Sequence, residues 1–519
     1  MIERVVENWL TNTNEIGYQI PFAQYLLSEN YQVLHLSKHG QMEQGKDIIS
    51  IDNNGKTCVF QLKGGNIGLT EWRKIKGEID ELIEVPIHYP GIDKKIADRA
   101  VLVTNGVISD PVRRTIDDLN PVYKQRGFTQ LELITKMDLL KRFLTMHGTF
   151  LPSEPTEFKQ FLELYYSDER ALIDKEAYAH FVESILFSSK ETKPELNRKI
   201  ASGLLLNQYI LTKYFRSENN LSIAEGCTLF GSYILALVEK YNLEEKYWRA
   251  SFNLILKLII ESLDSLKSEF LKRTEYLEDS WDGGLIYKSR MTIVLGWLSA
   301  FELYRKSVDA SYSLDELILK KIKSYREYLW YWGESATGYF ITMSMLAEKL
   351  GDSSLSTNIL IDLVAKIGVE NGSKDGKGFP NSYYSAEEVI GYSYKIEERE
   401  LDSESFLGQS YHIGAIVDML TRRNKRRELD ELWNLISKLM ITEFKPSSKW
   451  QFLFWQTDEG EQVQHFYDHP QSWGDLRTKA KDVTNVDLPL SLQKNPFSYF
   501  FLLTYPHRIT RESVKQIDF

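Results

Sequence analysis

A small set of polar and charged side chains occupies the open ends of a predicted β-hairpin. Asp47 stands at the mouth of one apolar run, and Gln61 and Lys63 close the next one. The intervening Asn-Asn-Gly-Lys at 53–56 is a tight-turn signal, because Asn and Gly tolerate a positive φ. A tight turn there brings Asp47 close to Gln61 and Lys63.

These residue types suit the hydrolysis of phosphodiester bonds. That reaction needs a divalent metal at the scissile phosphate, an activated water and stabilisation of the extra negative charge in the transition state. Carboxylates and a backbone carbonyl suit Mg²⁺, and a lysine beside the metal can orient or deprotonate water. Gln61 and Lys63 point to one face of their strand, whereas Leu62 points to the opposite face, into the core. Gly64 and Gly65 then let a backbone approach closely.

The elements around the hairpin predict a mixed sheet with helices on its faces over residues 1–150. Strands are indicated by β-branched and apolar runs, and helices by apolar spacing or capped starts. The predicted order is helix (21–31), strand (31–37), two hairpin strands (47–52 and 57–63), helix (69–85), strand (99–106), helix (109–119), strand (131–135) and helix (136–144).

The remainder of the chain is predicted to be helical. A stretch with two prolines and no periodicity at 147–158 marks the expected domain boundary. We therefore expect a large all-α region over 151–519 that senses a signal or binds a partner. A break near 371–382 could divide it into two lobes, and the last hundred aromatic-rich residues are expected to form a partly extended cap.

Residues 20–145 resemble the Mrr-like branch of the PD-(D/E)XK restriction-endonuclease superfamily. The resemblance rests on a leading helix, the strands in "GKDIIS", "VFQLKGG" and "VLVTNG", and the closing "LELIT". It implies a restriction-endonuclease-like α/β fold and an endonuclease that depends on Mg²⁺ or Mn²⁺. The family pattern implies Asp47 as a metal ligand, Gln61 at the second ligand position, the Leu62 carbonyl as a further ligand and Lys63 as the catalytic lysine.

The chain departs from the family pattern at one acidic position. Mrr-like enzymes usually place a glutamate on the first helix, but the corresponding stretch here contains Gln19 and Gln24 and no acid. Glu15 lies just upstream, and Glu43 lies shortly before Asp47. Either glutamate could supply the missing carboxylate, so the sequence leaves open whether one or two metals act.

Two segments are candidates for contacts with nucleic acid. One follows the hairpin, and the other is the basic run "TRRNKRRE" at 421–428, which could touch phosphates or form a solvated connection between helices. The candidate contact residues are Gly64, Gly65, Arg73, Lys74, Arg422, Arg423, Lys425, Arg426 and Arg427. By contrast, the Gly-Lys pair in 371–378 lacks P-loop spacing, and His465 and His469 beside Pro470 favour a structural corner.

Composition restricts the classes of protein that fit this chain. The 519 residues suit two or three domains, and the net charge of −10 argues against a surface covered in nucleic-acid-binding groups, although a local basic site is compatible with it. Two cysteines, no basic leader and no long apolar span predict a cytoplasmic protein without a membrane segment.

Two functions from different classes fit the sequence. The first is an endonuclease acting on nucleic acid, expected to be DNA, in bacterial antiviral defence or restriction, as a homo-oligomer or with a partner defence protein such as an ATPase. The alternative is a non-catalytic interaction scaffold that keeps a degenerate nuclease fold. Cleavage in the presence of Mg²⁺ or Mn²⁺ discriminates between them.

Overall fold

The computed structural model describes most of the chain in two compact units. The described residues are 2–29, 31–36, 45–87, 96–147, 155–187, 192–272, 283–394, 403–482 and 488–518. The first unit combines Met1–Phe230 with Leu243–Glu261, and the second combines Gly231–Asn242 with Ser262–Phe519.

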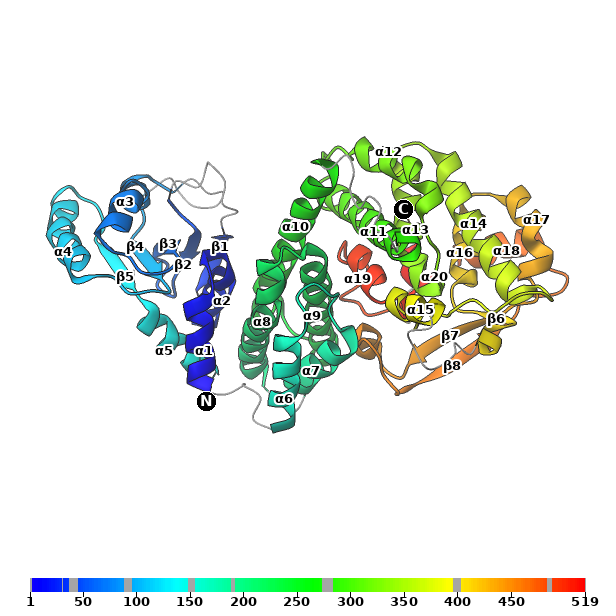
Figure 1. The fold of residues 1–519 in the computed structure, drawn as a ribbon, viewed down its shortest axis with the longest axis horizontal. Helices are drawn as coiled ribbons and strands as arrows, with labels where there is room; N and C mark the ends of the chain where they lie inside the picture. Colours follow the sequence, from blue (N-terminus) through cyan, green and yellow to red (C-terminus); the bar gives the residue numbers. More distant parts are fainter. Residues whose placement is uncertain are drawn as a thin grey trace. The chain divides into compact units, whose positions relative to one another are not determined.

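The first unit contains the predicted mixed sheet, which has five strands in the order β1-β2-β3-β4-β5 (Figure 1). The first three strands are antiparallel neighbours, and β3, β4 and β5 run parallel. The strands are β1 (Gln32–Leu36), β2 (Ile48–Ile51), β3 (Thr57–Lys63), β4 (Arg99–Thr104) and β5 (Leu131–Ile134). The tight hairpin is therefore confirmed, and it supplies two of the three central strands.

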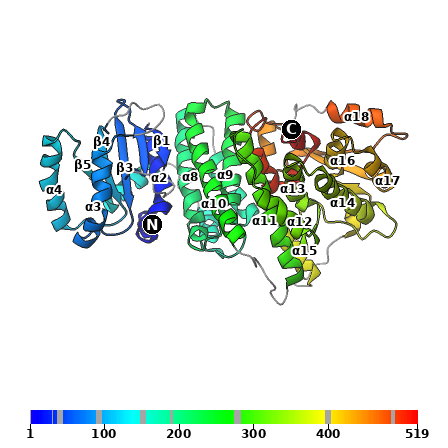
Figure 2. The ribbon, with the colours of Figure 1, turned by 90° about the horizontal axis from the view of Figure 1, so that it is seen from above.

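Helices cover both faces of this sheet, as Figures 1 and 2 show. Val59 belongs to an apolar cluster with residues of α3 and α4. The next residue along the strand, Phe60, contacts Phe22 of α2 with ring centroids 5.4 Å apart, because successive strand residues point to opposite faces. The helices are α1 (Ile2–Asn12), α2 (Glu15–Ser28), α3 (Leu69–Glu84), α4 (Asp110–Gln125) and α5 (Lys136–His147).

The N-terminal helices differ from the predicted one. Helix α2 begins at Glu15 rather than at Pro21, because the Asn14 side chain accepts a hydrogen bond from Gly17 N and starts the helix there. Helix α1, which the sequence analysis omits, precedes it. Its residues Val6, Trp9 and Leu10 recur at helical spacing and are buried.

The first helices beyond residue 150 belong to the same compact unit as the sheet. They are α6 (Pro155–Tyr166), α7 (Lys175–Phe187), α8 (Lys193–Arg216), α9 (Asn220–Tyr241) and α10 (Arg249–Lys272), with α9 and α10 crossing into the second unit. Trp9 Nε1 donates to Thr212 Oγ1 at 3.2 Å, and Gln24 Nε2 donates to Ser251 Oγ at 2.9 Å. The core of the predicted boundary, 148–154, lies outside the described residues.

Helix α9 is also the most apolar long segment. Among the described residues it alone is long and apolar enough to cross a membrane, and 89% of its apolar window is buried inside the structure. Burial of this extent is how a core helix of a globular protein behaves.

The second unit is largely helical. Its helices are α11 (Gly283–Val308), α12 (Glu316–Ser324), α13 (Thr337–Lys349), α14 (Ser353–Gly372), α15 (Ala386–Ser393), α16 (Ile413–Arg422), α17 (Arg426–Ile436), α18 (Trp473–Lys481), α19 (Ser498–Thr504) and α20 (Arg511–Lys515). The segment between α14 and α15, which holds the predicted break, lies within this unit.

The expected all-α region also contains strands, and the prediction is wrong in that respect. The second unit contains a three-stranded sheet of β6 (Gln409–Ser410), β7 (Met440–Pro446) and β8 (Gly460–His465). Strands β7 and β8 lie in the last hundred residues, where a partly extended cap was expected, whereas the aromatic stretch 497–508 forms α19 and a short 3₁₀ turn at Pro506–Arg508, both buried. Strand β8 is largely exposed and carries polar residues such as Glu461 and Gln462, so its apolar pattern is weak.

Candidate active site

The turn of the hairpin sets its register. Asp52 N donates to Lys56 O at 2.9 Å, and Gly55 N donates to Asp52 O at 3.0 Å. The Asp52 carboxylate also accepts from the backbone N–H groups of Asn54 and Lys56. Gly55 has a φ of 74°, a conformation that glycine adopts without strain. This local network fixes which residues face one another at the other end of the hairpin.

At the open end of the hairpin, Asp47 lies beside the last residues of β3. Ile48 pairs with Phe60, so Asp47 lies beside the following residues of β3. Asp47 N donates to Phe60 O at 2.8 Å, and its Oδ2 accepts from Leu62 N at 2.6 Å. Asp47 is buried. The predicted proximity of Asp47 to the end of β3 is thus confirmed.

Gln61 and Lys63 project from β3 toward α3, where Glu78 meets both of them. Lys63 Nζ lies 2.7 Å from Glu78 Oε2, and Gln61 Nε2 donates to the same oxygen at 3.3 Å. Sequence reasoning missed Glu78. The available signal was its place three residues after Ile75 and four before Leu82, at the border of the apolar stripe that α3 buries.

The amide oxygen of Gln61 has a different environment from its nitrogen. Gln61 is buried, and its Oε1 has no hydrogen-bond partner among the described residues. A buried polar atom without a partner is costly unless a ligand, an ion or water satisfies it. Gln61 therefore presents an acceptor oxygen that none of the described residues uses.

Lys63 is a cation held among carboxylates. Burial lowers the pKa of its ammonium group, but the hydrogen bond with Glu78 and the attraction of Glu15, Glu78 and Asp47 outweigh that effect, so the pKa lies above its ordinary value. Lys63 is consequently protonated at neutral pH in this arrangement.

Glu15 is the candidate second carboxylate that the structure brings to the hairpin. Its Oε1 accepts from Gly64 N at 3.0 Å and lies 4.0 Å from Lys63 Nζ. The Asn14 cap that starts α2 places Glu15 in the first helical turn, beside the end of β3. The other candidate, Glu43, lies outside the described residues.

Helix α2 also fastens the backbone of both hairpin strands. The Tyr18 hydroxyl lies 3.0 Å from Lys63 O and accepts from Lys63 N at 3.1 Å, and it lies 3.2 Å from Val103 O. Burial raises the pKa of Tyr18 well above its usual value, with a further contribution from Glu15, so the hydroxyl keeps its proton. Gln19 Nε2 lies 3.4 Å from Asp47 O. Through these contacts, α2 supports the backbone at the ends of the two hairpin strands.

The residues at the hairpin end fit a hard divalent cation in their chemistry. Leu62 N points toward Asp47, and the N–H and C=O of one strand residue point to the same side, so the Leu62 carbonyl also faces the end of β2. Together with Asp47 and Gln61 Oε1 this gives the all-oxygen donor set that Mg²⁺ and Mn²⁺ prefer. No group of three or more His, Cys, Asp and Glu residues with metal-binding geometry occurs among the described residues, so such a site would rely on neutral oxygens as well.

The two glycines after Lys63 are both exposed, and each donates its backbone N–H to a side chain of another element. Gly64 N donates to Glu15 Oε1 at 3.0 Å, and Gly65 N donates to Asn105 Oδ1 at 2.7 Å. A Cβ on the neighbouring Gly106 would lie 2.2 Å from the Gly65 backbone. This stretch is thus a close crossing of two backbones at the ends of β3 and β4. Arg73 and Lys74 are exposed on the first turns of α3.

The basic run of the second unit is divided between two roles. Arg422 and Arg423 bind the Asp518 carboxylate at 3.1 and 2.8 Å and are largely buried. Arg426 and Arg427 are exposed and each lies one helical turn before an acid of α17. Lys425 is the residue before that helix. The run therefore forms the connection between α16 and α17, one of its two predicted roles, and only its second half is open to a partner.

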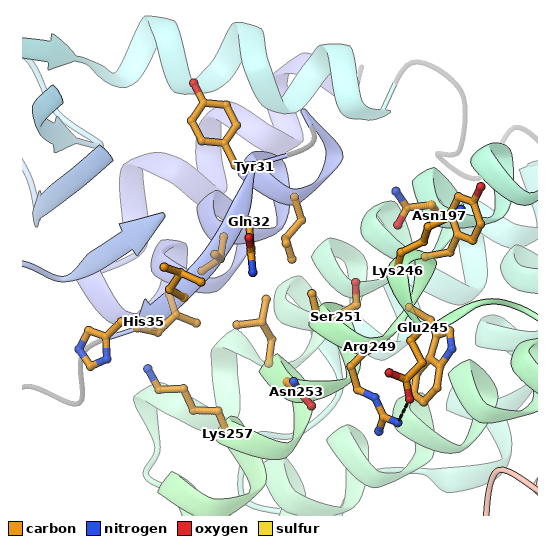
Figure 3. A pocket seen from close by; sticks show the side chains of 18 residues that line it. Tyr31, Gln32, His35, Asn197, Glu245, Lys246, Arg249, Ser251, Asn253 and Lys257 are labelled. Atoms are coloured by element: carbon orange, nitrogen blue, oxygen red, sulfur yellow. Dashed lines mark hydrogen bonds and ion pairs between the residues drawn. The ribbon is translucent and has the colours of Figure 1, made fainter. Parts of the chain in front are cut away.

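A cavity of about 760 Å³ in the first unit is a second place where a ligand could lie (Figure 3). Gln32 and His35 of the edge strand β1 line one side, and Lys257 lines the other (Figure 3). Its charged groups are engaged in ion pairs, such as Arg249 with Glu245 at 2.5 Å. The cavity therefore adds no second candidate set of groups for the chemistry expected at the hairpin end.

Comparison with known proteins finds no family model, no curated protein and no solved structure that matches the chain.

Proposed function

We propose that this protein is a metal-dependent endonuclease that hydrolyses phosphodiester bonds, with DNA as the expected substrate. The observation that carries the proposal is the meeting of Asp47, Gln61 and Lys63 at one end of the β2–β3 hairpin, where Gln61 Oε1 is buried and has no partner in the part of the chain that the structure describes. A carboxylate and an amide oxygen suit a divalent metal, and an ammonium group beside them suits stabilisation of the charge that develops during phosphodiester hydrolysis.

Each residue has a separate role in the proposed reaction. Asp47, Gln61 Oε1 and the Leu62 carbonyl would hold Mg²⁺ or Mn²⁺, which when bound supplies a Lewis acid for the phosphate oxygen and lowers the pKa of a bound water. Lys63 is a positive charge beside the scissile phosphate, where it orients water and offsets the charge that develops. Glu15 holds Gly64 N and keeps the end of β3 in place.

The proposed biological role follows from the resemblance to Mrr-like endonucleases. An endonuclease of this kind in a bacterial cell would act in restriction or antiviral defence. The helical part of the chain would bind the partner or form the oligomer on which cleavage depends. Large helical surfaces with exposed charged side chains suit such contacts.

A cleavage assay tests the proposal. Full-length protein is incubated with plasmid, linear duplex, single-stranded DNA and RNA, with Mg²⁺ or Mn²⁺ and with EDTA as the control. Metal-dependent cutting that Asp47→Asn abolishes supports the proposal. If the protein cuts none of these substrates, alone or with its candidate partners, it acts instead as an interaction scaffold with a degenerate nuclease fold.

A further inference from the structure

Glu78 joins the two side chains of β3 that face the proposed metal position. A single oxygen, Oε2, lies 2.7 Å from Lys63 Nζ and accepts from Gln61 Nε2 at 3.3 Å. Glu78 comes from α3, which is anchored on the sheet by buried residues including Ile75 and Ile79. Glu78 is thus a half-exposed acceptor, carried by an anchored helix, that reaches β3 from a separate element.

The contact with Glu78 determines the orientation of the Gln61 amide, with Nε2 toward Glu78 and Oε1 away from it. A carboxylate attracts the NH₂ end of an amide and repels its oxygen. With Nε2 on Glu78, the Gln61 oxygen is turned away from it and has no partner among the described residues. Were the amide reversed, its NH₂ group would occupy the position from which a cation must be bound.

We propose that Glu78 is a positioning residue that orients the Gln61 amide so that Oε1, not Nε2, is offered to the metal, and that keeps the Lys63 ammonium group beside it. The inference rests on the proposed function. Hydrogen bonds to the residues that bind a metal commonly change affinity by about 10–100-fold when they are lost.

The test measures Mn²⁺ binding to the full-length protein directly, from the electron paramagnetic resonance signal of free Mn²⁺, without any cleavage. We expect Glu78→Ala to weaken binding about tenfold. Glu78→Gln should recover most of that loss, because its amide oxygen can still accept from Gln61. Glu71→Ala is the matched control, since Glu71 lies on the same helix and forms an exposed ion pair with Lys74 at 3.0 Å; it should leave binding unchanged.

A second substitution separates orientation from simple charge. In a Gln61→Glu background the ligand is a carboxylate with two equivalent oxygens, so it needs no orientation, and Glu78→Ala should no longer weaken binding. Equal losses in both backgrounds, or no loss in the Gln61 background, would overturn the proposal. Asp47→Asn distinguishes this failure from a failure of the proposed function: if Asp47→Asn leaves Mn²⁺ binding unchanged, the metal is not at the hairpin and both ideas fall.

Discussion

Lys63 is bound on two sides by acids, with Glu78 at 2.7 Å and Glu15 at 4.0 Å from its Nζ. Burial lowers the pKa of Lys63, but these carboxylates outweigh that effect and raise it. In the proposed reaction this favours a role for Lys63 as a positive charge over a role as a proton acceptor.

Substitution of Lys63 is the most direct test of the proposed catalytic site. We expect Lys63→Ala to reduce metal-dependent cleavage by about 100-fold or more, as loss of a group that stabilises transition-state charge does. Lys63→Arg should fail as well, since a planar guanidinium does not replace a compact ammonium group. Thermal unfolding should shift little, because partly exposed ion pairs contribute about 1 kcal/mol or less. Wild-type turnover in Lys63→Ala would contradict the assignment.

The second acid is tested by removing each candidate in turn. Glu15 accepts from Gly64 N and lies near Lys63, so Glu15→Gln should raise the Mn²⁺ concentration needed for half-maximal cleavage. Glu43→Gln is the parallel variant for the second candidate. If both variants require the same Mn²⁺ concentration as the wild type, the site works with Asp47, Gln61 and a carbonyl, or takes its acid from elsewhere.

At the scale of residues, local contacts could be predicted and distant ones could not. Asp47, Gln61 and Lys63 are linked by one tight turn, so their proximity follows from the Asn-Asn-Gly signal and the period of two. Glu78 and Glu15 arrive from separate helices whose packing on the sheet no short pattern specifies. The pairing of an acid with Lys63 therefore depends on tertiary packing. The one sequence signal for it is the position of Glu78 beside the apolar stripe of α3.

Two glycines in the elements that carry the site differ in backbone conformation. Gly55 has a φ of 74° in the hairpin turn, whereas Gly77 lies inside α3, and an added Cβ would touch nothing within 4 Å at either position. Any difference between their alanine variants must then come from the backbone. The hairpin carries Asp47 and Lys63, and α3 carries Glu78, so both elements bear on the site.

We expect Gly55→Ala to destabilise the hairpin by about 1 kcal/mol, because alanine resists a left-handed conformation. Gly77→Ala should stabilise α3 by about 0.4–1 kcal/mol, because it reduces the freedom of the unfolded chain and favours helix. Hydrogen exchange of the full-length protein, read from peptides covering 47–63 and 69–84, measures both effects. The same sign of change in the two variants would contradict this account.

Patterns of apolar residues predicted the elements of the sheet better than those of the second unit. Runs such as "RAVLVT" are buried on both faces and give an unmistakable strand. Helix α1 could have been predicted from the helical spacing of Val6, Trp9 and Leu10, whereas α2 begins at a polar cap that competes with the proline signal. Strand β6 has only two residues, and β8 is polar and largely exposed, so neither gives a clear apolar pattern.

One buried acid in the second unit gives the fold a pH dependence. Glu334 accepts from the Ser410 hydroxyl and from Tyr411 N at 2.9 Å, just before α16 begins. Burial raises its pKa to about 7, although these hydrogen bonds and one from His412 N oppose the rise. An acid whose folded-state pKa is raised costs nothing when protonated in both states, and it lowers stability as pH rises from its ordinary pKa through the raised one.

We therefore expect Glu334→Gln to gain stability relative to the wild type as the pH rises from about 5 to 8. Urea-unfolding midpoints of the second unit at these two pH values measure the difference, with tryptophan fluorescence as the signal. Glu387→Gln, an exposed acid on α15 of the same unit, serves as the control. A difference between Glu334→Gln and the wild type that stays constant with pH would show that Glu334 does not titrate in this range.

At the scale of the whole molecule, the sheet and the helices that follow it cannot be treated as separable pieces. Trp9 and Gln24 donate to Thr212 and Ser251, and Arg216 donates to Asn12 O at 2.7 Å, all within the first unit. Truncation at residue 150 would remove these partners and expose the buried Trp9. Control of the proposed cleavage activity by the helical region must therefore be tested in the full chain.

We expect the full-length protein alone to cut weakly, and to be stimulated by self-association or by a partner, because few features of this chain read nucleotide sequence and free cutting would be harmful. The exposed pair Arg426 and Arg427 is the candidate contact, whereas Arg422 and Arg423 are committed to Asp518. Arg426→Ala with Arg427→Ala should reduce stimulated cleavage more than basal cleavage. If the pair contacts phosphates, the double variant should also show a shallower salt dependence.

The measurement is initial cleavage rate against protein concentration, with and without candidate partner proteins, at several salt concentrations. The matched control is Lys159→Ala, an exposed cation on α6 in the other unit that lies one helical turn before Glu163, which tests whether loss of any surface charge has the same effect. A rate per molecule that stays high and constant down to concentrations where the protein is monomeric, and that no partner changes, would contradict control of catalysis by the helical region. The helical region would then have a role in localisation or assembly, since the proposed cleavage would depend neither on self-association nor on a partner.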